Sequence, residues 1–264
     1  MTRERTNLLE GVHEYWRPPP ITHSATRKQK VTAYVQRLLD LQYGSIHNDL
    51  EQELSSAHGT VLDAGCGGQP FRWLLPQGVS YIGLDIVDAK EKFGYEQPDT
   101  IYYSGDVWPI ESGSVDLVLC TETLEHVIEP APFLAEAHRC LKRDGRLVLT
   151  VPFAARWHFI PNDYWRFTPS GMEHLLSKAG FAEIRIYGRG NALTVACYKA
   201  MTLYLAQAWP YGKKPIRQIV SILIGAILSP FFLLLAAIGN LSMSRDGGND
   251  YLGLTVTARS RRAS

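Results

Sequence analysis

Three acidic side chains follow three short apolar segments, and their spacing indicates a ligand site. Asp63 lies in "VLDAGCGG", where Gly65 and Gly67 occupy alternate positions after it; Asp85 closes "YIGLDI", and Asp106 opens "DVWPI". Glycine allows positive φ angles and close approach of a bound molecule. A carboxylate at the first position suits a cationic group and would repel a pyrophosphate. The carboxylate of Asp85 can accept hydrogen bonds from both hydroxyls of a ribose, and that of Asp106 can accept one from an adenine amino group.

The elements that must position these residues are the strands of a mostly parallel sheet. From Thr60 on, short apolar runs alternate with helical stretches, a pattern typical of βαβ units. We expect strands at "TVLDAG", "SYIGLDI", "TIYYSGD", "VDLVLCT", "GRLVLTVP", "AEIRIYG" and "YLGLTVTAR". The chain then divides into an N-terminal helical lid region (1–59), a cofactor-binding core (60–190), a hydrophobic helical insert (191–248), and a last strand with a basic tail (249–264).

Composition narrows the classes of function. The chain has 264 residues and a formal net charge of +1, so no overall field attracts nucleic acid. Its four cysteines are scattered without a CxxC pair, and we expect neither a metal site nor a disulfide framework. The first 20 residues contain no apolar segment of the kind found in a secretory signal. We therefore expect a catalytic part that stays in the cytoplasm.

Together these motifs resemble those of class I S-adenosylmethionine-dependent methyltransferases of the type 11 group. The resemblance runs through "VLDAGCGG", "YIGLDI", "GDVWPI", "SVDLVLCTETLEHV" and "AEAHRCLKRDGRLVLTVPF", and includes the last strand. It implies a Rossmann-like α/β fold with a seven-stranded, mostly parallel sheet and a reversed last strand. It also implies S-adenosyl-L-methionine as cofactor, held by Asp63, Gly65, Cys66, Gly67, Asp85, Ile86, Asp106, Val107, Thr121 and Glu122. The chain departs from the family at Gln69, where a third glycine is frequent.

Two histidines are candidate catalytic residues. His126 follows the fourth strand on the side of the sheet where α/β proteins place their ligands, and His158 follows the fifth. Either could act as a general base on an acceptor hydroxyl. A histidine in such a place often only satisfies a backbone or cofactor group. Glu122 and Glu125 are interpreted as charges at a helix N-terminus and not as a carboxylate pair.

The loop after the fifth strand is a candidate acceptor site. It brings aromatic and hydrogen-bonding side chains together in "HFIPNDYWRF", and we assign substrate binding to Asp163, Tyr164, Trp165 and Arg166. The alternative is a packed loop that caps the core. A similar "H…P…DYWRFT" run occurs in methyltransferases associated with cell-surface glycan biosynthesis, which implies a related acceptor.

A long apolar segment precedes the last strand. No charged residue occurs between Arg217 and Arg245, a length that would span a bilayer as a helix. Because the sixth and seventh strands should pair, a single crossing would leave the last strand on the wrong side. We favour a shallow helical hairpin that is broken at Pro230. Residues 216–244 would attach the protein to the inner face of a membrane. The anionic headgroups would then contact the flanking basic residues, Lys213, Lys214, Arg217 and Arg245. Two crossings, and a buried insert or dimer interface, remain as alternatives.

These observations predict a membrane-associated enzyme that methylates an oxygen of a lipid-linked or glycan precursor. A quinone or isoprenoid C- or O-methyltransferase is the alternative of the same class. A non-catalytic membrane scaffold that binds the cofactor is the alternative of another class. The expected partners are a small-molecule, lipid-linked or glycan acceptor and a membrane surface, without nucleic acid.

Overall fold

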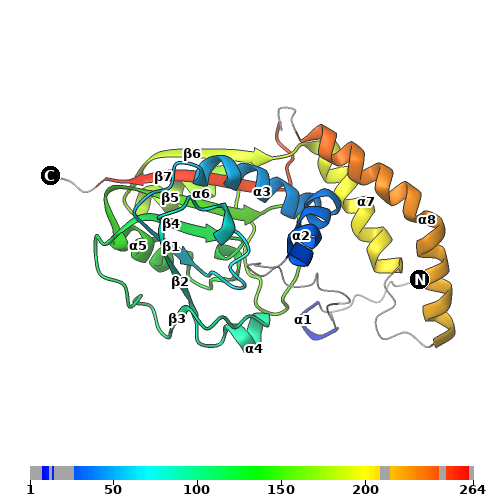
Figure 1. The fold of residues 1–264 in the computed structure, drawn as a ribbon, viewed down its shortest axis with the longest axis horizontal. Coiled ribbons are helices and arrows are strands. Elements are labelled where there is room, and N and C mark those ends of the chain that lie inside the picture. The colour runs from blue at the N-terminus through cyan, green and yellow to red at the C-terminus, as the bar shows by residue number, and fades with distance from the viewer. Residues whose placement is uncertain (1–7, 12–13, 15–26, 209–214, 244–247, 262–264) are drawn as a thin grey trace, which may run out of the picture.

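The centre of the molecule is a seven-stranded sheet. The computed structural model describes residues 8–11, 14, 27–208, 215–243 and 248–261. Strand order in the sheet is β3-β2-β1-β4-β5-β7-β6, and β7 runs antiparallel to both of its neighbours. The remaining pairs are parallel. The Rossmann-like fold, the reversed last strand and the apolar insert before it are therefore confirmed (Figure 1).

The elements follow one another as βα units, flanked by helices at both ends. The strands are β1 (Thr60–Ala64), β2 (Ser80–Ile86), β3 (Thr100–Tyr103), β4 (Val115–Thr121), β5 (Leu141–Pro152), β6 (Phe181–Arg189) and β7 (Gly253–Ser260). The helices are α1 (Leu8–Gly11), α2 (Arg27–Leu39), α3 (Leu41–Leu54), α4 (Ala89–Phe93), α5 (Pro130–Cys140), α6 (Pro169–Lys178), α7 (Ala192–Ala208) and α8 (Pro215–Ser242), with short 3-10 turns at Arg72–Leu74 and Leu124–His126.

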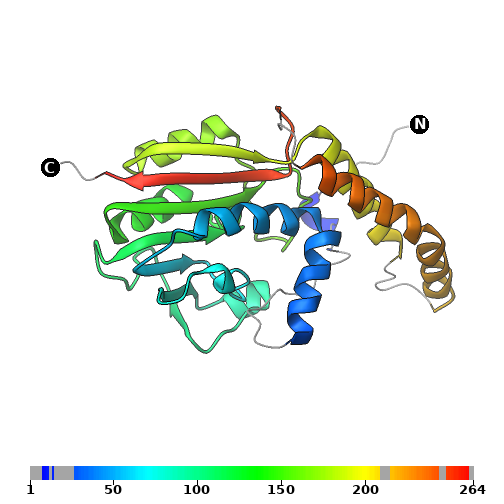
Figure 2. The same cartoon turned by 45° about the horizontal axis from the view of Figure 1, so that its top comes forward.

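Both faces of the sheet are covered, which explains why its central strands are apolar throughout. Val61 belongs to a cluster under α3, whereas the next residue, Leu62, belongs to a larger cluster that includes α5 and α6. Neighbouring side chains of a strand point to opposite faces, so a strand covered on both sides needs apolar residues at successive positions. The part of the expected lid region that forms α3 thus packs on the sheet, while α2 leads away from it (Figure 2).

The turn after β1 does not lead into the long α-helix that a regular βαβ unit would place there. Only the 3-10 turn Arg72–Leu74 follows the glycines. Gln69, at the position where a third glycine is frequent, has a positive φ of 56° and is buried, and its amide nitrogen donates to Asp99 at 3.0 Å. A side chain thus fixes a turn that glycine would leave loose.

The apolar insert forms two antiparallel helices, α7 and α8, that extend beyond the sheet (Figure 1). The predicted break at Pro230 is wrong, because α8 continues through this residue from Pro215 to Ser242. Proline cannot donate to the carbonyl four residues earlier. The hydroxyl of Ser229 donates to that oxygen, of Ala226, at 2.8 Å and so replaces the lost bond.

Small residues line the seam along which α8 packs. A Cβ atom added to Gly225 would lie 2.8 Å from the Cβ of Ala208 in α7, and one added to Gly239 would lie 2.5 Å from the Leu41 side chain. Away from the seam the helix exposes large apolar side chains: Ile219, Val220, Ile222, Leu223, Ile224, Ile227, Leu228, Phe231, Leu233, Leu234 and Leu241. Within the described residues, Gln218–Ser242 is long and apolar enough to cross a membrane. The helix is not a buried core element. Lys213, Lys214 and Arg245 lie outside the described residues.

Candidate active site

A pocket of about 280 Å³ lies at the carboxyl ends of β1, β2 and β4. Of the residues predicted to bind cofactor, Gly65, Cys66, Gly67, Asp85, Thr121 and Glu122 line it, and both candidate catalytic histidines line it as well. Carboxyl ends of parallel strands meet at one edge of a sheet, so these side chains converge although they are distant in the sequence. Phe93, Tyr95 and Phe159 add aromatic faces that the sequence analysis did not assign.

Asp85 shapes the pocket as well as lining it. One carboxylate oxygen accepts from the backbone nitrogen of Gly67 at 2.9 Å, and the other accepts from that of Ile86 at 2.8 Å. Burial raises the pKa of Asp85, and these two backbone bonds oppose the rise. Each oxygen retains a second lone pair for a ligand hydroxyl.

Asp63 is buried behind the glycine turn. Its Oδ2 accepts from the Tyr81 hydroxyl at 2.8 Å, whereas its Oδ1 has no hydrogen-bond partner among the described residues. Burial raises the pKa of Asp63 to about 7, and the charge of Asp85 adds to the rise. A cationic group beside Oδ1 would therefore be bound strongly.

The other predicted cofactor residues lie outside the residues that line this pocket. Ile86 ends β2 and donates its backbone nitrogen to Asp85. Asp106 and Val107 lie in an exposed turn after β3, and 70% of the Val107 surface is accessible. Their contact with an adenine base stays a prediction.

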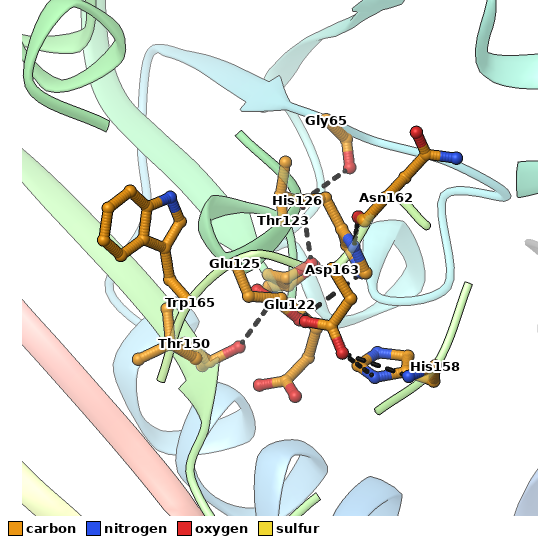
Figure 3. A network of polar contacts seen from close by, with 12 residues as sticks. Gly65, Glu122, Thr123, Glu125, His126, Thr150, His158, Asn162, Asp163 and Trp165 are labelled. Carbon is orange, nitrogen blue, oxygen red and sulfur yellow. Dashed lines mark hydrogen bonds and ion pairs between the residues drawn. The ribbon is translucent and has the colours of Figure 1, made fainter. Parts of the chain in front are cut away.

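His126 and His158 face each other at the pocket, with ring centroids 5.0 Å apart (Figure 3). The Nδ1 atom of His126 contacts the carbonyl oxygen of Asn162, and the Nδ1 of His158 lies 2.9 Å from Asp163 Oδ2 and 3.1 Å from the carbonyl oxygen of Arg156. These partners are acceptors, so both Nδ1 atoms carry hydrogen and a neutral ring presents Nε2 as a lone pair. Burial lowers the pKa of His126 to about 4, and the neighbouring His158 adds to this.

Glu125 lies in the first turn of a 3-10 helix, as the sequence interpretation expected, but its surroundings differ from those of an ordinary helix charge. It lies within the 3-10 turn and is fully buried, and neither carboxylate oxygen has a hydrogen-bond partner among the described residues. Burial raises the pKa of Glu125 well above its usual value. Glu122 adopts a positive φ of 48° before that turn and accepts from Arg189 at 3.0 Å. The buried Arg189, at the end of β6, was not singled out in the sequence.

The four predicted substrate residues lie beside the histidines and outside the residues that line the cavities. Asp163 accepts from Arg166 at 2.6 and 2.8 Å and from the backbone of His158 at 3.1 Å. Burial alone would raise the pKa of Asp163, but these bonds more than offset it and the pKa is lowered. Tyr164 and Trp165 are about two-fifths exposed. Direct contact of the four with an acceptor stays a prediction; Asp163 and Arg166 position His158.

A second, larger cavity of about 630 Å³ adjoins the first. The two share Gln36, Asp40, Gln42, Glu122 and His158 as lining residues. Much of the remaining wall is apolar and comes from α2, α7 and α8: Val31, Val35, Leu39, Met201, Leu205 and Phe232. The sequence analysis missed Asp40 and Gln42; the available signal was the aspartate before an apolar helical pattern, because Asp40 caps α3.

The residues of the smaller pocket fit S-adenosylmethionine. Asp85 lines the pocket and suits ribose hydroxyls, while the buried Asp63 does not line it but has an Oδ1 without a hydrogen-bond partner among the described residues, which suits a cation. Neither lysine nor arginine lines the pocket within the described residues, which disfavours a phosphate-bearing cofactor. The donor set therefore matches a cationic nucleoside.

Comparisons with known proteins agree with a pocket for S-adenosylmethionine. Residues 62–149 match the family model of a methyltransferase domain. The ubiquinone biosynthesis O-methyltransferase of Xanthomonas oryzae pv. oryzae is 30% identical over 158 residues, 53% of this chain and 64% of that protein. The matched regions cover 32% to 64% of the first curated relatives.

Solved structures share the fold at low identity. A possible histamine N-methyltransferase from Thermotoga maritima has a TM-score of 0.51 at 15% identity, covering 88% of this chain and 96% of that one. The [4+2]-cyclase SpnF has a TM-score of 0.52 at 18% identity, covering 84% and 83%. The second likeness shows that this fold also carries other reactions. The family match together with the acidic nucleoside pocket leads to one conclusion: residues 62–149 are a methyltransferase domain of the S-adenosylmethionine-dependent class.

Proposed function

We propose that the protein transfers a methyl group from S-adenosylmethionine to an oxygen of a lipid-linked acceptor at a membrane surface. The observation that supports this most directly is the apolar cavity beside the cofactor pocket. Its polar end carries Glu122 and His158, and its far wall is built from the insert helices α7 and α8. An acceptor with a hydroxylated head and an apolar tail matches both ends.

The chemistry required of the chain is modest. When bound, S-adenosylmethionine supplies a methyl group that is already activated by its sulfonium, so alignment with the acceptor oxygen provides most of the catalysis. His158 lines both the donor pocket and the acceptor cavity, and His126 lines the donor pocket with its ring 5.0 Å from that of His158, so both rings border the place where an acceptor hydroxyl would meet the methyl donor. The rings of Phe93 and Phe159 pack against His126 and limit access of water.

The acceptor is tested by incubating the protein with labelled cofactor and a lipid extract of the host. Label should appear in a lipid fraction. Leu205→Trp, which fills the apolar cavity, should reduce transfer at least tenfold with little change in cofactor affinity. Leu203→Trp is the matched control, because this leucine lies two residues earlier in α7 and is 70% exposed. Equal transfer by the two variants would contradict the assignment of the cavity.

A quinone-like or isoprenoid ring is the second candidate acceptor. Several curated relatives favour it, since they are named ubiquinone biosynthesis O-methyltransferases. A hydroxylated ring with a prenyl tail would fit the same cavity. Separating the labelled lipids into ring-bearing and glycan-bearing fractions decides between the candidates. Cofactor binding without labelling of any fraction would instead support the non-catalytic scaffold.

Membrane attachment is assigned to the exposed side of α8. Leu223 and Ile227 are 58% and 76% exposed. Burying such a side chain in lipid contributes about 1.5 to 3 kcal/mol, so Gln at both positions should weaken binding to vesicles about 100-fold or more. Gln at Val87 and Ile128, which are exposed on the methyltransferase domain, is the control. Sedimentation with anionic vesicles measures the effect, and equal sedimentation of both double variants would exclude α8 as the anchor.

A further inference from the structure

The cluster of His126, His158 and Glu125 has the composition of a metal site (Figure 3). Each of the three offers one ligand atom, and these atoms lie within 4.8 Å of one another. Ligands about 2.1 Å from one ion can lie at most about 4.2 Å apart, so binding requires the side chains to close by a fraction of an ångström. Two imidazoles and a carboxylate form a donor set suited to divalent transition metals.

The hydrogen bonds around the two rings orient them as ligands. In each ring, Nδ1 is occupied by an oxygen acceptor: the Asn162 carbonyl for His126, and Asp163 with the Arg156 carbonyl for His158. Backbone carbonyls and carboxylates in this role are typical of metal-binding histidines, because they fix the tautomer that leaves Nε2 free.

Glu125 supplies an independent observation. Its side chain is fully buried, and neither carboxylate oxygen has a hydrogen-bond partner among the described residues. Buried polar groups are nearly always satisfied. His126 Nε2 lies 3.7 Å from Oε1, which is too far for a hydrogen bond and close to the separation of two ligands on one ion. A protonated Glu125 would still lack an acceptor for its hydrogen.

The surrounding charges favour a cation. Arg166 is paired with Asp163, and Arg189 is paired with Glu122. Each pair is neutral as a whole, so the Glu125 carboxyl group is a buried acidic group whose oxygens have no hydrogen-bond partner in this part of the described structure. A divalent ion would both satisfy that carboxylate and occupy the lone pairs that face it.

We propose that Glu125, His126 and His158 bind a divalent transition-metal ion that holds the acceptor's hydroxyl oxygen beside the methyl donor. The bound hydroxyl loses its proton to solvent more readily, and its oxygen then bonds to the methyl carbon as the carbon–sulfur bond breaks toward sulfur. The histidines then act through the ion and do not take the proton themselves. This role rests on the proposed methyl transfer, whereas metal binding does not. The proposal departs from the sequence analysis, which examined only cysteine spacing and expected no metal.

Metal binding is tested on the full chain after treatment with EDTA and dialysis. Titration with Zn²⁺ in a calorimeter should show one ion per chain, and Co²⁺ should give the visible absorption of a nitrogen- and oxygen-ligated site. His158→Ala and the isosteric Glu125→Gln should each weaken binding about 100-fold or more, at or above the upper end of the loss typical of a residue that only supports a ligand. His174→Ala and Glu173→Gln, both on the exposed side of α6, are the matched controls and should bind as the unchanged chain does.

The outcomes separate the proposal from the function on which its role rests. Absence of Zn²⁺ binding, or equal binding by His158→Ala and His174→Ala, would overturn the site. Thermal unfolding establishes that each variant is folded, and Glu125→Gln provides the test if the alanine variant is not. Unchanged methyl transfer by metal-free protein would overturn the role of the ion and leave the methyltransferase intact. Metal binding without any transfer would support the site and contradict the proposed function.

Discussion

Replacing Asp85 with alanine tests the geometry of the cofactor pocket most directly. The carboxylate is positioned by two backbone nitrogens, those of Gly67 and Ile86, at 2.9 and 2.8 Å. It can still accept from two ribose hydroxyls. A hydrogen bond to a charged group contributes about 1.5 to 3 kcal/mol, so losing both removes about 3 to 6 kcal/mol of binding free energy. The dissociation constant of the cofactor should therefore rise by about 10² to 10⁴-fold.

The same substitution should also lower stability. Two backbone N–H groups lose their acceptor, and one such buried donor costs about 1 to 3 kcal/mol. Urea unfolding of the cofactor-free protein measures this loss, and calorimetry with S-adenosylhomocysteine measures affinity. Asp88→Ala is the control, because this residue lies three positions later and forms a half-exposed ion pair with Lys92 at 3.3 Å.

A cofactor analogue that lacks one ribose hydroxyl completes the test. The unchanged protein should bind the analogue more weakly than the parent compound, whereas Asp85→Ala should bind both equally, since the partner of that hydroxyl is already absent. An equal penalty in both proteins, or unchanged affinity in a folded variant, would refute the assignment of Asp85 to the ribose.

The remaining predictions concern charge and packing. Because the folded pKa of Asp63 is raised to about 7 from 3.8, its contribution to stability is present at acidic pH and is lost as the pH rises toward 7. Between pH 5 and pH 8 the free energy of unfolding of the cofactor-free protein, measured with urea, should fall by about 2 to 3 kcal/mol more than that of Asp63→Asn. Parallel pH profiles of the two proteins would contradict this. Arg189→Met should destabilise by about 3 to 5 kcal/mol, because it leaves a partly buried carboxylate unpaired, while Met at the exposed Arg185 should change stability little. Gly225→Leu should push α7 and α8 apart and lower the thermal midpoint in detergent, with Leu at the exposed Ala226 as its control; equal midpoints would contradict the close seam.

The sequence alone was sufficient to predict the features that depend on residues close together in the chain. Alternation of short apolar runs with helical stretches predicted the sheet, and the requirement that β6 and β7 pair predicted that the insert must return before β7. Asp63, Gly65, Gly67 and Asp85 could be named as candidates because strand ends and glycine turns leave a signal within a few residues; the last three line the smaller pocket. A signal of that kind depends only on nearby positions, which is why it is readable without a fold.

Tertiary structure alone decided what depends on distant segments. The continuation of α8 through Pro230 depends on a neighbouring hydroxyl, and its seam depends on small residues that meet α7. The large cavity combines α2, α7 and α8, three segments with no shared motif. Glu125 and His158 lie 33 residues apart, and only the return of the loop after β5 to the end of β4 brings them together. The spacing of residues in the sequence carries information about positions that are close along the chain. Burial and the convergence of side chains, in contrast, result from packing between distant segments.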